Sequence, residues 1–111
     1  MEVGHRQQND VAVVALSGRL DASAATQAEA GLDSALGSPG PRLAIDLTGL
    51  DYISSAGLRV LLVVAKKVQR ANGKLALFGL CDNVREVFAV SGFDTIFPIA
   101  ADAAGAVAAV R

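Results

Sequence analysis

Two adjacent serines, Ser54 and Ser55, follow a predicted buried strand and an acidic turn, at the point where the next helix is expected to begin. A helix N-terminus presents unpaired backbone N–H groups, and its dipole favours negative charge. A hydroxyl at this place therefore serves either as a helix cap or as an acceptor for a phosphoryl group. One cap needs one hydroxyl and this helix start has two, so both roles stay open for the pair.

Three aspartates are expected near the serine pair. Asp46 stands at the carboxyl end of the predicted strand over 43–47, the edge at which parallel α/β sheets place their sites. We expect Asp46 to accept backbone N–H bonds and so hold the serine loop in shape. Asp51 fits turn chemistry. Asp21 follows a neighbouring strand, so it either caps the next helix or lies on the same surface as Ser55.

Arg59 lies four residues after Ser55, so both side chains point to one face of the helix. A cation in a first helical turn opposes the helix dipole. Two interpretations stay open. Arg59 is either a solvated surface residue, or it contacts a protein partner or pairs with phosphorylated Ser55.

Residues suited to catalysis or metal binding are sparse. The chain has one histidine, His5, near its N-terminus, and one cysteine, Cys81, without a histidine to activate it. The sequence lacks nucleophile-elbow, phosphate-loop and dinucleotide-binding motifs. Asp46 and Asp51 have no further ligands at metal spacing. The residues therefore predict a binding protein without a metal or cofactor, and not an enzyme.

The composition indicates one globular domain over residues 1–111. Hydrophobic residues make up 52% of the chain, which argues for a sheet covered on both faces. The net charge of -1 provides no basic field for nucleic acid. The apolar runs are too short to span a bilayer, the N-terminus lacks a signal-peptide core, and a single cysteine fits a reducing compartment. We expect a cytoplasmic protein that binds neither nucleic acid nor membrane.

Apolar periodicity and turn residues divide the chain into alternating strands and helices. Strands are expected over 3–7, 11–16, 43–47 and 74–79, with a short extended segment over 93–99. Helices are expected over 24–36, 55–71 and 82–90, with a last alanine-rich helix after residue 102. The predicted N-caps are side chains that accept a backbone hydrogen bond: Asp21 or Ser23, Ser54 or Ser55, Asp82 or Asn83, and Asp102.

This order predicts an α/β domain with a mixed, mostly parallel sheet of four to five strands and helices packed on both faces. The first strand is expected to be antiparallel, because the short turn over 8–10 can only form a hairpin. On the helix after Ser55, the apolar positions at helical spacing form the predicted core face: Leu58, Leu61, Leu62, Ala65 and Val68.

The run 54–58, Ser-Ser-Ala-Gly-Leu after an apolar strand, resembles the signature of STAS domains and in particular of bacterial anti-sigma factor antagonists. The run 16–21, Leu-Ser-Gly-Arg-Leu-Asp, resembles a strand of that family that ends in G-x-[LI]-D, and the order of elements fits nearly all 111 residues. In the family, an Asp-Ser pair most often stands at this place, and its serine is the residue that a partner kinase phosphorylates, which is Ser55 here. The first is most often aspartate and is Ser54 here, which makes Ser54 the second choice as acceptor.

The resemblance implies a partner-switching cycle. When dephosphorylated, the domain would bind an anti-sigma factor that is itself a serine kinase, and so release the sigma factor. Phosphorylation of Ser55 would end the complex, and a metal-dependent PP2C-type serine phosphatase would restore it. The partner-binding surface is expected to comprise the serine loop and its neighbours: Asp21, Asp51, Ser54, Ser55, Gly57, Leu58 and Arg59.

Two other functions stay open. A STAS scaffold or regulatory module could act without phosphorylation, for example within a larger sensory assembly. A small enzyme or ligand-binding domain could use Asp46, Asp51 and Ser55 as polar groups, which would require a pocket of several hundred Å³.

Overall fold

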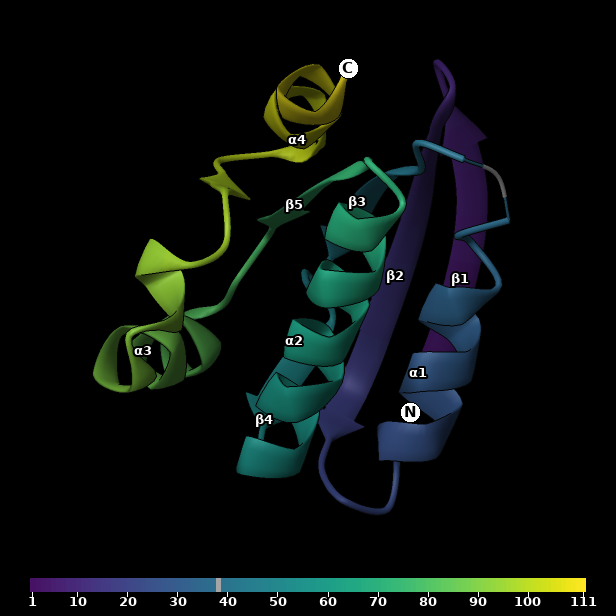
Figure 1. The fold of residues 1–111 in the computed structure, drawn as a ribbon. Coiled ribbons are helices and arrows are strands. Elements are labelled where there is room, and N and C mark those ends of the chain that lie inside the picture. The colour runs from purple at the N-terminus through teal and green to yellow at the C-terminus, as the bar shows by residue number, and fades with distance from the viewer. Residues whose placement is uncertain (38) are drawn as a thin grey trace.

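The computed structural model describes residues 1–37 and 39–111, and its helices and strands alternate after an initial pair of strands (Figure 1). The strands are β1 (Glu2–Gln8), β2 (Val11–Leu20), β3 (Arg42–Asp46), β4 (Leu50–Ile53), β5 (Lys74–Phe78) and β6 (Ile99–Ala100). The helices are α1 (Ala25–Asp33), α2 (Ser55–Arg70), α3 (Asp82–Ser91) and α4 (Ala103–Val110), with a 3-10 turn, η1 (Phe93–Thr95), after α3.

The strands form one mixed sheet in the order β1-β2-β3-β5-β6, and β4 pairs with the carboxyl end of β2. β1 runs antiparallel to β2, whereas the pairs β2·β3, β2·β4, β3·β5 and β5·β6 are parallel. Asn9 and Asp10, which join β1 to β2, have φ angles of 51° and 67°, as a tight two-residue hairpin requires. The predicted mixed sheet and antiparallel first strand are confirmed.

Helices cover both faces of the sheet (Figure 1). The larger core lies on the side of α1, α2 and α3, and the smaller core lies under α4. Because side chains alternate along a strand, β2 supplies Val14 and Leu16 to the larger core and Val11 and Val13 to the smaller one. The carboxyl ends of β2 and β4 are thereby held beside the start of α2.

Two segments differ from the sequence prediction. The sequence prediction missed β4. In this strand two exposed residues lie between two buried ones, so the run 50–53 does not alternate between apolar and polar residues as a half-buried strand does. This irregularity accompanies a register shift between Gly18 and Arg19 of β2. The segment over 93–99 is mostly not extended: Gly92, at φ 76°, turns the chain from α3 into η1, and Phe93 packs edge-on against Phe88.

The predicted helix caps are only partly right. α1 has no side-chain cap, because Asp21 bonds to the hydroxyl and N–H of Ser23 instead. α3 has none either, and Cys81 occupies its N-cap position. Asp102 is confirmed as the cap of α4, since its Oδ1 accepts from the N–H of Gly105 at 2.8 Å.

The buried face of α2 is also only partly as predicted. Leu62 and Ala65 are half-buried and border a groove, whereas two valines between the predicted positions reach the core. The buried residues of α2 are Gly57, Leu58, Val60, Leu61, Val64 and Val68.

Candidate functional site

Ser54 is the N-cap of α2. Its backbone is extended, at φ -97° and ψ 175°, and its Oγ accepts a hydrogen bond from the N–H of Gly57 at 3.3 Å. The same hydroxyl donates to the carbonyl oxygen of Leu20 at 3.3 Å. Its donor and one acceptor site are therefore engaged within the protein. The expectation that one serine of the pair caps the helix is confirmed, and that serine is Ser54.

Ser55 is the first residue of the 16-residue helix α2, and its side chain is exposed. Its hydroxyl is not part of the cap that Ser54 makes. The first turn of α2 contains no acidic residue, so no side chain there offsets the positive end of the helix dipole. An exposed hydroxyl at such an end offers a place where a phosphate group is electrostatically favoured.

Gly57 lets the start of α2 lie directly on the ends of β2 and β4. A Cβ at this position would come within 2.6 Å of the carbonyl oxygen of Leu20 and 2.8 Å of Cγ1 of Ile53. Leu58, next to Gly57, is buried in the larger core. The Gly-Leu pair therefore positions the serine loop from inside, because a larger residue at 57 would push the helix away from the sheet.

Asp21 and Ser54 lie side by side because they follow paired strand ends. Leu20 of β2 is the register partner of Ile53 of β4, and the N–H of Ser54 donates to the carbonyl oxygen of Leu20 at 2.9 Å. The Ser23 hydroxyl donates to Asp21 at 2.7 Å and lowers the pKa of that carboxyl below its ordinary value. An ionised Asp21 thus belongs to the same edge as the serine loop.

Asp46 stabilises the turn between β3 and β4. Its Oδ1 accepts a hydrogen bond from the N–H of Thr48 at 2.9 Å. The expected backbone hydrogen bond is therefore present. It stabilises the turn before β4, and β4 separates this turn from the serine loop.

Two charged residues complete the surroundings of Ser55. Asp51 is exposed on β4, and Arg59 is exposed one turn further along α2. Sequence reasoning missed a cation–π pair at this edge, formed by Arg19 and Tyr52. The two residues are register partners on β2 and β4, and the Arg19 Cζ lies 4.2 Å from the centroid of the tyrosine ring. Tyr52 is 38% exposed. An aromatic residue inside a predicted polar turn was the available signal for this pair.

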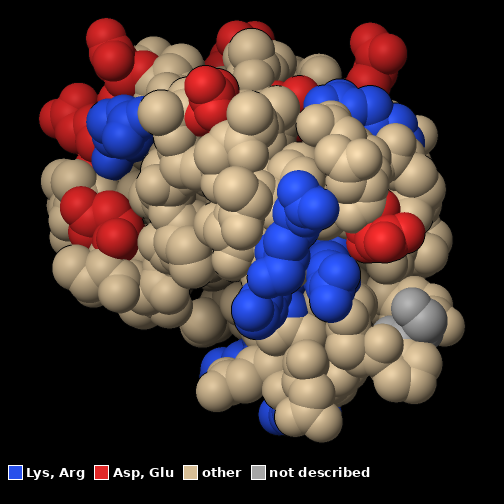
Figure 2. Space-filling view, turned by 90° about the horizontal axis from the view of Figure 1, so that it is seen from above, with Lys and Arg blue, Asp and Glu red and all other residues tan. Residues whose placement is uncertain are grey.

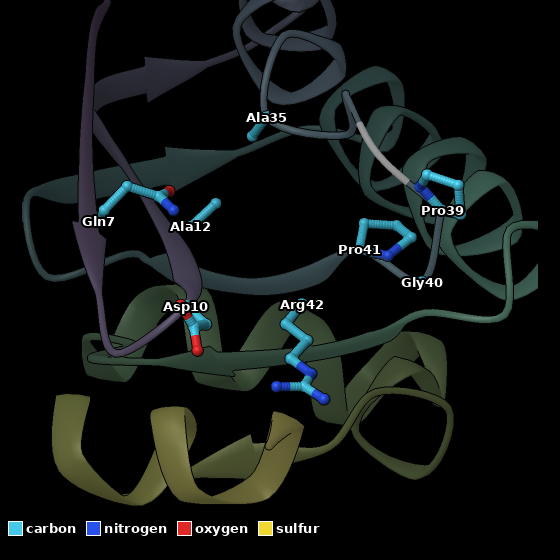
Figure 3. A pocket seen from close by; sticks show the side chains of 8 residues that line it. All are labelled: Gln7, Asp10, Ala12, Ala35, Pro39, Gly40, Pro41 and Arg42. Atoms are coloured by element: carbon cyan, nitrogen blue, oxygen red, sulfur yellow. The ribbon is translucent and has the colours of Figure 1, made fainter.

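Other parts of the surface are hollowed. A hollow of about 330 Å³ lies at the opposite end of the sheet, where Asp10 precedes β2 and Arg42 begins β3 (Figure 3). Another, of about 490 Å³, lies between α2 and the segment that follows η1. Neither is lined by Asp46, Asp51 or Ser55, the polar groups expected to serve a ligand-binding domain.

Residues 1–37 and 39–111 also bear on two other functions, membrane insertion and metal binding. These residues contain no helix that is both long and apolar enough to cross a membrane. They also contain no group of three or more His, Cys, Asp or Glu side chains placed to hold a metal ion.

The fold and the site together define a class of protein: a mixed α/β domain that presents an exposed serine at the start of a long helix, beside the carboxyl ends of two parallel strands. The model of the STAS domain family matches residues 3–106, and the chain belongs to this family. The family resemblance read from the sequence is confirmed.

Similar proteins are known from several bacteria. BtrV of Bordetella bronchiseptica, named a putative anti-sigma factor antagonist, is 44% identical over 99 residues, which cover 89% of this chain and 85% of BtrV. The anti-sigma-B factor antagonist of Listeria monocytogenes is 29% identical over 89% of this chain and 86% of its own. The crystal structure of an anti-sigma factor antagonist from Mycobacterium paratuberculosis matches with a TM-score of 0.88 at 25% identity, covering 99% of this chain and 93% of that one.

Proposed function

We propose that this protein is an anti-sigma factor antagonist that is switched by phosphorylation of Ser55. The observation that carries the proposal is the different use of the two serines. The hydroxyl of Ser54 caps α2 and bonds to Leu20, whereas Ser55 is exposed at the positive end of the helix. The names of the similar proteins from Bordetella, Listeria and Mycobacterium support the same function.

The proposed cycle needs two protein partners. The unphosphorylated domain binds an anti-sigma factor that is also a serine kinase, and the sigma factor is released. In the kinase, the Ser55 oxygen attacks the γ-phosphorus of ATP, ADP leaves, and the hydroxyl proton passes to a base of the kinase. A PP2C-type phosphatase hydrolyses the phosphoserine. This chain catalyses neither step, and it acts in the cytoplasm with the sigma factor.

The proposed contact surface is the edge around Ser55. Asp21, Asp51 and Arg59 are exposed or half-buried around it and are placed to contact the partner. Gly57 and Leu58 are buried, so they contribute to this surface indirectly, by fixing the position of the serine loop.

Charge explains how one phosphate could end the complex. Phosphorylation adds about -1.5 to -2 units of charge at neutral pH. The N-terminus of α2 accommodates this charge in the free domain. In the complex, the phosphate would share the interface with the acidic residues Asp21 and Asp51 and would have to be desolvated. A loss of about 3 kcal/mol weakens binding more than roughly 100-fold, so the domain need not change shape.

The test is to mix the purified protein with the anti-sigma factor kinase encoded in the same genome, with and without ATP. Without ATP we expect a stable complex by size-exclusion chromatography. With ATP we expect dissociation and one phosphate on the peptide that contains Ser55, mapped by mass spectrometry. Stable binding without phosphorylation would instead support a STAS scaffold, and absence of binding would overturn the proposal.

A further inference from the structure

The outward side of α2 carries a regular row of side chains, which we call the α2 row. Its members follow one another at alternating spacings of four and three residues, the repeat by which one helix packs along another. Four are exposed and the leucine is half-buried. In Figure 1, α2 lies in front of the sheet between α1 and α3, and no other element of the described chain lies in front of it. The α2 row consists of Ser55, Arg59, Leu62, Lys66 and Gln69.

An apolar groove lies beside the second half of the α2 row. It has a volume of about 490 Å³, with Leu62 and Ala65 of α2 on one side and Ile96 and Pro98 on the other. Ile96 is 55% exposed, although it is a large aliphatic residue. Lys66 contributes to the polar rim of the groove. A groove of this kind, apolar inside and polar at the rim, suits the anchor residues of an amphipathic helix.

The charged residues of α2 are all basic. The helix contains Arg59, Lys66, Lys67 and Arg70 and no acidic residue. Lys67 is neutralised by two carboxylates of α1, at 3.3 Å and 3.0 Å. Within residues 1–37 and 39–111, the other three cations form no ion pair. A partner covering this side of α2 therefore needs negative charge.

We infer that the α2 row and its groove form the docking site for an acidic amphipathic helix of the anti-sigma factor, an inference that rests on the proposed function. The spacing fits a helix, the groove fits its apolar anchors, and the unpaired cations fit its carboxylates. At 1.5 Å per residue the row is about 21 Å long, so the partner helix needs about four turns. Because the row begins at Ser55, a phosphate there would repel the acidic helix directly.

Two residues outside the row provide matched controls. Arg42 begins β3, at the end of the sheet opposite Ser55, and is the register partner of Lys74. Figure 2, the view from above, shows Lys and Arg side chains gathered on this end of the molecule. The Lys74 ammonium donates to the carbonyl oxygen of Arg111 at 3.2 Å in the same area. Val90, on α3, is 84% exposed and lies outside the groove. Arg42 thus matches Lys66 in charge, and Val90 matches Ile96 as an exposed aliphatic residue.

The test measures binding of the full chain to the anti-sigma factor kinase of the same genome, without ATP, by titration calorimetry at low and high salt. Lys66→Glu is expected to raise Kd about tenfold and to flatten its salt dependence. Ile96→Glu is expected to raise Kd about tenfold or more, because it places a carboxylate at an apolar anchor site. Arg42→Glu and Val90→Glu should leave Kd unchanged. Thermal unfolding of each variant establishes that it is folded.

A photo-crosslinking residue in place of Gln69 identifies what covers the groove. We expect it to attach to a segment of the kinase with apolar residues at helical spacing and several Asp or Glu residues. If the wild-type chain binds the kinase, and the Lys66→Glu and Ile96→Glu variants bind it with the same Kd, this inference alone is overturned. Crosslinks only between copies of this chain, with a dimer in sedimentation, would also overturn it. No binding of the wild-type chain would overturn the proposed function and this inference together.

Discussion

Ser54 is joined to Leu20 by two hydrogen bonds that end on one atom. The backbone N–H of Ser54 donates to the carbonyl oxygen of Leu20 at 2.9 Å, and the Ser54 hydroxyl donates to the same oxygen at 3.3 Å. An ionised aspartate at this position could accept the N–H of Gly57 but could not make the second donation. The serine therefore links the start of α2 to the end of β2, beside Asp21.

The first prediction separates the two serines. Ser55→Ala should abolish phosphate transfer from the kinase and leave stability nearly unchanged, because the side chain is exposed and outside the cap. Ser54→Ala should keep phosphate transfer but lower the free energy of unfolding by about 1–2 kcal/mol through loss of the cap. Mass spectrometry and urea unfolding measure the two effects. Phosphate on Ser54 in the wild-type chain would reverse the assignment.

The second prediction concerns the charge at Ser55. Ser55→Asp should weaken binding to the kinase, and Ser55→Ala should bind tightly even when ATP is present. The aspartate carries less charge and fewer acceptor oxygens than a phosphate, so its effect should be smaller than that of phosphorylation. Titration calorimetry should give the highest affinity for Ser55→Ala, a lower affinity for Ser55→Asp and the lowest affinity for the phosphorylated protein. Equal affinity of the aspartate and alanine variants would contradict the charge argument.

The third prediction concerns the close approach at Gly57. Gly57→Ala should lower the free energy of unfolding by about 1–3 kcal/mol, because the new methyl group meets the Leu20 carbonyl and cannot be accommodated without moving the helix start. Gly4→Ala is the matched control, since a Cβ there lies 3.8 Å from the Cβ of Ala15, an ordinary contact. Urea unfolding of both variants checks the difference. If both are equally stable, Gly57 is not needed for packing.

The sequence could predict the elements that have strong periodicity and the site that has a distinct motif. The serine pair with the Gly-Leu pair after it marked the start of α2, and the run from Leu16 to Asp21 marked the neighbouring strand end. Their adjacency followed from parallel strands, whose carboxyl ends lie at one edge. The backbone register now pairs Leu20 with Ile53, the residues that directly precede Asp21 and Ser54.

Two of the three missed features depend on contacts between distant segments. β4 forms because Leu50 and Ile53 pair with a bulged stretch of β2, and no local pattern announces that pairing. Asp21 looked like a helix cap by residue type, yet its carboxylate bonds to Ser23. Leu62 looked like a core residue by spacing, yet the chain after η1 leaves a groove beside it. For Leu62, tertiary packing overrides a local preference, whereas Asp21 is engaged by a residue only two positions away.

The last prediction concerns Arg59, the fifth residue of α2, which is exposed and forms no ion pair within residues 1–37 and 39–111. If it contacts partner carboxylates, Arg59→Ala should weaken binding of the unphosphorylated domain by about 1–2 kcal/mol and reduce the salt dependence. If it pairs with phosphorylated Ser55, unphosphorylated binding should stay the same and the Tm of the phosphorylated form should fall relative to wild type.

Arg85→Ala, which removes an exposed cation from α3, serves as the control in both measurements. We expect partner contact, because Arg59 is an exposed cation to which carboxylates of a partner would supply an ion pair. Calorimetry at two salt concentrations decides between the two roles. If neither affinity nor the Tm of the phosphorylated form changes, Arg59 is a solvated surface residue, and the docking site on α2 begins beyond it at Leu62.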